Sequence, residues 1–107
     1  MASHADTSRL QSSRSQSRVH MVVTGVVQGV GFRYFTVMAA RRYDVTGWVR
    51  NRMDGSVELE AQGAEADVER FERAVEGGPR WSRVEHVDID AVPVVPGEQG
   101  FSVHSDR

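Results

Sequence analysis

The sequence contains neither cysteine nor lysine among its 107 residues. The lack of cysteine excludes disulfides, thiolate metal sites and cysteine nucleophiles, so stability must come from packing and backbone hydrogen bonds. The lack of lysine excludes Schiff-base chemistry, lysine general bases and the lysine of a P-loop. All 13 basic residues are arginines. Cationic chemistry therefore has to use the guanidinium group, which is permanently charged and binds oxyanions with a planar fork.

Long apolar runs and a strong net charge are also missing. No segment approaches the ~20 apolar residues that a membrane-spanning helix needs, and the N-terminus lacks the apolar centre of a signal peptide. We therefore expect a cytoplasmic protein that does not associate with membranes. The net charge is -2, which argues against a nucleic-acid partner because proteins that bind nucleic acids usually present a basic face.

The first part of the chain differs in composition from the rest. Residues 1–17 are rich in serine, arginine and glutamine and have almost no large apolar side chains. Such a segment buries too little surface to offset the entropy of ordering it. We predict a disordered N-terminal tail over residues 1–17 and a single folded domain over residues 18–107. A basic interaction arm is the alternative interpretation of the tail.

The remaining residues alternate between strand and helix patterns. Strand-like runs at 19–24, 45–52, 56–62 and 84–91 are separated by helical patterns at 32–43 and 64–76, and 101–104 is a possible short last strand. The turn Asp54-Gly55 joins the second and third strands in a hairpin. The order βαββαβ predicts an α+β, ferredoxin-like sandwich, with a mostly antiparallel sheet and two helices on one face. That fold supports many unrelated activities, so function has to be argued from particular residues.

A glycine-rich loop follows the first strand. Gly25, Gly29 and Gly31 fall within seven residues, and successive N–H groups in such a loop can converge on an anion. The start of a helix follows directly, and Arg33 in its first turn adds a charged donor. The alternative is a tight connection whose glycines only turn the chain. Our hypothesis is an anion-binding loop formed by Gln28, Gly29, Val30, Gly31, Phe32 and Arg33.

A second candidate is Asn51, near the end of the second strand. Because side chains alternate along a strand, Gly47, Val49 and Asn51 share one face. Asparagine is uncommon in strands, and its amide offers both a donor and an acceptor, which suits the positioning of a water molecule. Capping of the hairpin is the more ordinary use of an asparagine there.

Both segments resemble motifs of the acylphosphatase family. Residues 25–33 (GVVQGVGFR) resemble the first motif at every position, and Gly47–Asn51, with Gly55, Val57 and Gly63, resembles the second. The resemblance covers roughly residues 18–104. It implies a hydrolase that splits the carboxyl-phosphate anhydride of acyl phosphates without metal or cofactor. It also implies that the 28–33 loop and Arg33 bind the phosphate, while Asn51 orients the attacking water.

Other functions remain open at this point. A binding module that holds inorganic phosphate or a similar anion without turnover, an accessory domain of carbamoyl-transfer machinery and an RNA-binding domain of the same fold are the alternatives. The acidic third strand, with Glu58 and Glu60, argues against RNA. We expect these two glutamates on a solvated strand face, Arg41 and Arg42 on a solvated helix surface, and a monomer. The motifs do not identify the physiological acyl phosphate, because their contacts are to the phosphate end.

Overall fold

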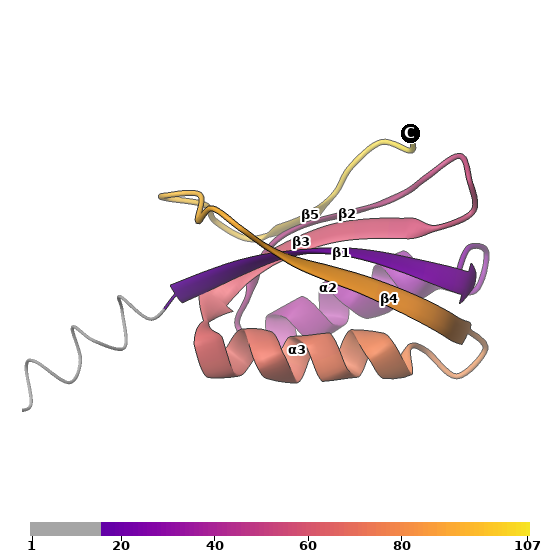
Figure 1. Ribbon diagram of the computed structural model, residues 1–107, viewed down its shortest axis with the longest axis horizontal. Coiled ribbons are helices and arrows are strands. Elements are labelled where there is room, and N and C mark those ends of the chain that lie inside the picture. Colours follow the sequence, from indigo (N-terminus) through magenta and orange to yellow (C-terminus); the bar gives the residue numbers. More distant parts are fainter. Residues whose placement is uncertain (1–15) are drawn as a thin grey trace, which may run out of the picture.

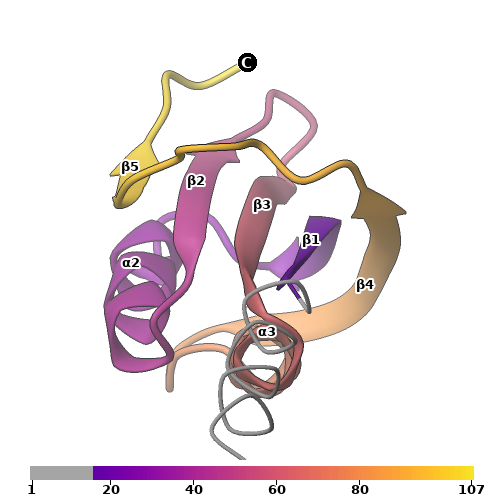
Figure 2. The ribbon, with the colours of Figure 1, turned by 90° about the vertical axis from the view of Figure 1, so that its left-hand side faces the viewer.

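The computed structural model describes residues 16–107, which form a five-stranded sheet with two helices packed on one of its faces (Figures 1 and 2). The strand order across the sheet is β4-β1-β3-β2-β5. This arrangement confirms the predicted βαββαβ order and the short last strand. The elements along the chain are β1 (Gln16–Val26), α2 (Phe32–Arg42), β2 (Thr46–Asn51), β3 (Val57–Ala64), α3 (Glu65–Gly77), β4 (Arg83–Val92) and β5 (Phe101–Val103).

The sheet is mixed and not wholly antiparallel. β1 pairs antiparallel with β3 and β4, and β2 pairs antiparallel with β3. β5 runs parallel to β2, with Gly47 opposite Phe101. The segment between β4 and β5, residues 93–100, joins the two edges of the sheet by crossing over its helix-free face (Figure 2), and we call it the crossover.

The first strand begins earlier than the sequence predicts. β1 starts at Gln16, where Gln16 pairs with Ala64 and Ser17 with Gly63 of β3. The predicted tail boundary was wrong for these two residues, because ladder hydrogen bonds are made by the backbone and do not require apolar side chains. The rest of the predicted tail, residues 1–15, lies outside the described residues.

The core lies between the sheet and the helices. Met21, Val23 and Leu59 point from the sheet toward the helices and are fully buried. On α3 the buried residues are Val68, Phe71 and Val75, which form an apolar stripe at helical spacing. The apolar positions of β4 are only partly covered: Ile89 is 39% exposed, and Ala91 is exposed as well. β4 is an edge strand, so only part of its inner face lies over a helix.

The helix-free face carries buried charges. Arg18 is only 3% exposed and binds Glu60 at 2.7 Å and Glu98 at 2.8 Å. Gln62 also holds the crossover, through the backbone N–H and carbonyl of Val95. The prediction that Glu58 and Glu60 are solvated was wrong: their side chains are 13% and 23% exposed. Glu58 binds Arg50 and His20, each at 2.6 Å, on this face, and Glu60 pairs with Arg18 under the crossover. Of the helices in residues 16–107, none has the length and apolar character needed to cross a membrane.

Candidate active site

The loop between β1 and α2 has the backbone geometry of an anion cradle. Gly29 and Gly31 have φ angles of 74° and 80°, in the left-handed region that favours glycine. A Cβ atom added at either position would meet nothing within 4 Å. Glycine is therefore required here for the backbone angles and not for space, and left-handed residues in a turn let successive N–H groups converge.

The start of α2 is open to an anion. Gly31 is the N-cap and has no side chain to bond the first N–H groups, and the first turn contains no acidic residue. These N–H groups lack intrahelical partners, and the helix dipole makes this end positive. The loop and the helix start thus present donors of the same kind to one place.

Two of the motif glycines have a different role. A Cβ at Gly25 would lie 2.1 Å from the carbonyl oxygen of Arg83, and one at Gly47 would lie 1.9 Å from that of Glu60. Both residues permit the close approach of neighbouring strands. Gly25 thus lies within β1 and not in the loop that follows it, although it starts the same motif.

The loop is held rigidly from both sides. Val27 and Phe32 flank it and are 1% and 2% exposed. Between them, the Gln28 side chain donates from Nε2 to the carbonyl oxygens of Arg52, at 2.7 Å, and Ser56, at 2.8 Å. Gln28 thus ties the loop to the β2–β3 hairpin. Sequence reasoning assigned only its backbone N–H, because nothing local reveals acceptors so far along the chain.

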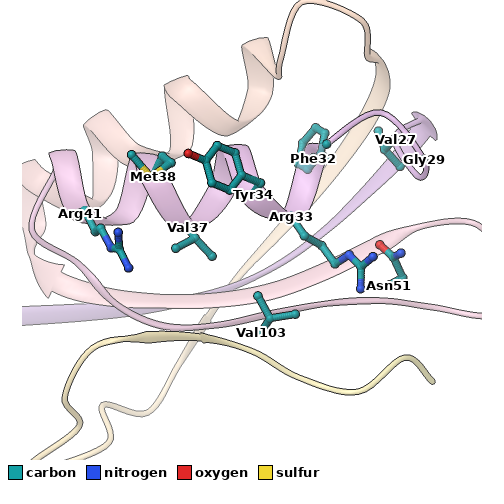
Figure 3. Close-up of a pocket in the computed structure, with 11 residues that line it drawn as sticks. Val27, Gly29, Phe32, Arg33, Tyr34, Val37, Met38, Arg41, Asn51 and Val103 are labelled. Carbon is teal, nitrogen blue, oxygen red and sulfur yellow. The ribbon is translucent and has the colours of Figure 1, made fainter.

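Arg33 and Asn51 come together at this point. Both line one cleft, and Figure 3 shows the guanidinium and the amide side by side. Asn51 is 8% exposed and lies on the buried face of β2, as the strand alternation predicts. Within residues 16–107 its amide group has no hydrogen-bond partner, so it is available to a ligand or a water. The hairpin is instead capped by Asp54, whose Oδ1 accepts from Ser56 N at 2.9 Å.

The C-terminal segment brings an acid to Arg33. After β5 the chain continues beside β2, with His104 N donating to Val49 O at 2.8 Å and Arg107 N to Asn51 O at 3.0 Å. This path places Asp106 Oδ1 3.2 Å from Arg33 Nη1. The two side chains are 42% and 56% exposed, so the pair is a solvated one. Of the five N–H donors of the guanidinium, most stay available for another oxyanion.

The cleft itself has a volume of about 450 Å³. Gly29, Gly31 and Arg33 form one end with Asn51, and the cleft then continues along α2 to Arg41 (Figure 3). Arg41 and Arg42 are both exposed, as the sequence predicts, and Arg41 also lines the far end of the cleft. Residues 16–107 contain no group of three or more histidine, aspartate or glutamate side chains that could hold a metal ion.

Comparisons with known proteins agree on one family. The family model described as Acylphosphatase matches residues 19–103. The acylphosphatase of Bifidobacterium longum is 55% identical over 86 residues, which are 80% of this chain and 89% of that protein. The crystal structure of acylphosphatase from Bacillus subtilis superposes with a TM-score of 0.79 at 39% identity, covering 82% of this chain and 98% of that one. An acylphosphatase structure from Coxiella burnetii gives a TM-score of 0.81 at 32% identity, covering 88% and 98%.

Proposed function

The chain belongs to the acylphosphatase family, and from that premise we propose how its residues divide the work of the reaction. It is an acylphosphatase, which hydrolyses the carboxyl-phosphate anhydride of acyl phosphates to a carboxylate and inorganic phosphate. One observation carries our assignment of the site. A single cleft joins the glycine loop, the uncapped start of α2, Arg33 and Asn51.

The phosphate group is bound by the loop and Arg33. Backbone N–H groups of residues 28–33 donate to its oxygens, and the guanidinium adds a charge-assisted fork. The ties made by Gln28 and the burial of Val27 and Phe32 fix these donors before the substrate arrives. Donors that need no rearrangement stabilise the charge of the transition state most effectively.

Asn51 positions the water. Its amide oxygen accepts one hydrogen bond from the water and leaves the oxygen lone pair directed at phosphorus. The water oxygen forms the new bond to phosphorus while the bond from phosphorus to the acyl oxygen breaks. The acyl group departs as a carboxylate, and a proton of the water passes to a phosphate oxygen. A carboxylate is a good leaving group, so positioning and charge stabilisation suffice.

Hydrolysis of benzoyl phosphate by the purified protein, with a metal chelator present, tests this assignment. We expect turnover by the wild type and its loss in both Arg33→Ala and Asn51→Ala. Binding of inorganic phosphate distinguishes the two roles, because Arg33→Ala weakens it and Asn51→Ala leaves it nearly unchanged. Wild-type phosphate binding without any turnover would instead support a binding module. Full activity in either variant would refute the proposed catalytic pair.

The setting of the enzyme is also proposed. We infer that residues 16–107 act as one catalytic domain, as a monomer in the cytoplasm, without a nucleic-acid partner. Three of the most exposed large apolar side chains, Tyr34, Met53 and Trp81, lie on separate parts of the chain, and Tyr34 belongs to the cleft. Sedimentation equilibrium at increasing protein concentration measures the oligomeric state. A mass above that of one chain would contradict the monomer.

A further inference from the structure

The cleft is longer than the phosphate site requires. Arg33, Val37 and Arg41 are spaced by four positions on α2, so they follow one another along a single face of the helix. All three line the cleft, and Val103 of β5 lies opposite them (Figure 3). Eight residues of helix at about 1.5 Å each place the Cα atoms of Arg33 and Arg41 about 12 Å apart.

The middle of this cleft is apolar. Between the two arginines it is lined by Val37, Met38, Tyr34 and Val103. Met38 is 43% exposed and Val103 is 53% exposed. A ligand that covers such side chains is stabilised because their apolar surface is removed from water. The centre of the cleft thus suits the hydrocarbon part of a ligand and not a second charged group.

The far end is cationic. Arg41 is exposed and, within residues 16–107, forms no ion pair. Its neighbour Arg42 differs, because its guanidinium stacks over the Tyr43 ring at 5.5 Å and lines a separate groove toward α3. Either arginine complements the negative end of the helix dipole. Only Arg41 also faces the cleft that contains Arg33 and Asn51.

We propose that this cleft selects acyl phosphates whose acyl group is an extended, mainly apolar chain ending in a second anionic group, with Arg41 as the residue that determines this specificity. The inference rests on the proposed function, since the phosphate end must be seated at the loop and Arg33. The hydrocarbon part of the acyl group then lies over Val37, Met38 and Val103. Its terminal carboxylate or phosphate accepts hydrogen bonds from the Arg41 guanidinium. The bond that breaks is still the carboxyl-phosphate anhydride, and the far anion leaves unchanged as part of the product.

A matched pair of substrates tests the proposal. Octanoyl phosphate and the monophosphate of the eight-carbon dicarboxylic acid have the same chain length and differ in a terminal carboxylate. Acetyl phosphate, which fills only the phosphate end, serves as the reference. For the wild type we expect kcat/KM to be about five- to tenfold higher with the carboxylate-terminated substrate than with octanoyl phosphate. This ratio is typical of one charged hydrogen bond that is partly exposed to water.

Two arginine variants then measure the contribution of Arg41 at the far end of the cleft. Arg41→Gln is expected to reduce the preference for the carboxylate-terminated substrate to about one, mainly through KM. Arg42→Gln removes the same charge from the adjacent position and is expected to keep the wild-type preference. Val103→Thr preserves the shape of the side chain and is expected to lower the preference for octanoyl over acetyl phosphate.

The outcomes separate this inference from the function on which it rests. An enzyme that hydrolyses acetyl phosphate but shows no preference for the terminal carboxylate would overturn the inference alone. An equal loss of the preference in Arg41→Gln and Arg42→Gln would also overturn it, because a general charge effect would then explain the data. A wild type that hydrolyses none of the three substrates would overturn the proposed function together with this inference.

Discussion

Arg33 and Asp106 form an ion pair with 3.2 Å between Nη1 and Oδ1, although 73 positions separate them in the sequence. The carboxylate approaches the same guanidinium that we propose for phosphate binding. It therefore competes with the phosphate for N–H donors, and it adds a negative charge next to an anion site. Asp106 should therefore weaken phosphate binding both by occupying Arg33 and by charge repulsion.

Replacement of Asp106 by asparagine should tighten phosphate binding. Because the pair is exposed, its effect should be modest: the inhibition constant of inorganic phosphate should fall about two- to fivefold. The measurement is competitive inhibition at low and high ionic strength, where salt should shrink the difference. Asp88→Asn, which changes the same charge on β4 next to His86, is the control. A weaker phosphate affinity in Asp106→Asn would mean that the carboxylate mainly positions Arg33.

Arg33→Lys should be nearly as damaging as Arg33→Ala. Lysine keeps the positive charge but loses the planar fork that binds two phosphate oxygens together. We expect a fall in kcat/KM of at least ~100-fold, typical of the loss of a preorganised donor to a developing oxyanion. Steady-state kinetics with benzoyl phosphate gives the value. Near-normal turnover of the lysine variant would contradict the proposed role of the guanidinium.

Gln28 should act as a positioning residue. Gln28→Met retains the length of the side chain but removes the donor to the carbonyl oxygens of Arg52 and Ser56. We expect a loss of ~1–2 kcal/mol in the free energy of unfolding and a fall in kcat with little change in KM, because the hairpin that carries Asn51 loses its tie to the loop. Gln28→Glu distinguishes this from a steric effect. Its carboxylate cannot donate to a carbonyl, so it should be at least as impaired as the methionine variant.

The glycines should separate into two classes. Gly25→Ala places a Cβ against the carbonyl oxygen of Arg83 and should cost ~2–5 kcal/mol in the free energy of unfolding, from overpacking and a strained φ. The Cβ of Gly29→Ala would meet no atom within 4 Å. This variant should lose only the ~1–2 kcal/mol of unfolding free energy that a left-handed backbone costs an alanine. Chemical denaturation measures both values. Equal losses would contradict the assignment of Gly25 to strand packing.

Stability should fall in acid because of the charges on the helix-free face. Burial opposes ionisation of Glu58 and Glu98, but hydrogen bonds from His20 and Arg50 to Glu58, and from Arg18 and Thr46 to Glu98, hold both pKa values below the ordinary 4.5. A carboxyl whose pKa is lowered by folding contributes its full stability above pH 4.5 and loses it as the pH falls through the lowered pKa.

The free energy of unfolding, measured by urea denaturation from pH 7 to pH 3, tests this relation. The fall below pH 4.5 should be smaller in Glu98→Gln than in the wild type. Glu72 should have the opposite effect on stability, since burial and the nearby Glu76 and Glu69 raise its pKa. Glu72→Gln should therefore be more stable than the wild type at neutral pH, where the ionised Glu72 is unfavourable. An identical acid profile in Glu98→Gln would contradict the role of this ion pair.

Local patterns accounted for most of the fold. The alternation in β3 and the apolar stripe of α3 are properties of consecutive residues, so their buried faces follow from the sequence. The same holds for Asn51, whose face is set by its register with Gly47 and Val49. The motif resemblance then added the family, which the patterns alone do not distinguish from other proteins of this fold.

What the sequence could not reveal depends on which distant segments meet. Nothing near Gln28 indicates that its amide reaches the β2–β3 hairpin, and nothing near Asp106 indicates Arg33. Nothing near Arg18 indicates that the crossover brings Glu98 to its guanidinium. Ile89 is exposed only because β4 lies at the edge of the sheet. Each of these facts is fixed by topology, and topology is a property of the whole chain.

The strand order has a consequence for the time course of folding. β1 lies between β3 and β4, so Gln16 must find Ala64 and Arg18 must find Val92 before the centre of the sheet exists. Pairing of such distant residues requires the closure of long loops. The entropy of closure is lost before the contacts stabilise the sheet, and this slows folding. The cleft needs the loop after β1, the end of β2 and also β5. Catalytic activity should therefore return only in the last kinetic phase of refolding, after collapse and after most of the helical signal has recovered.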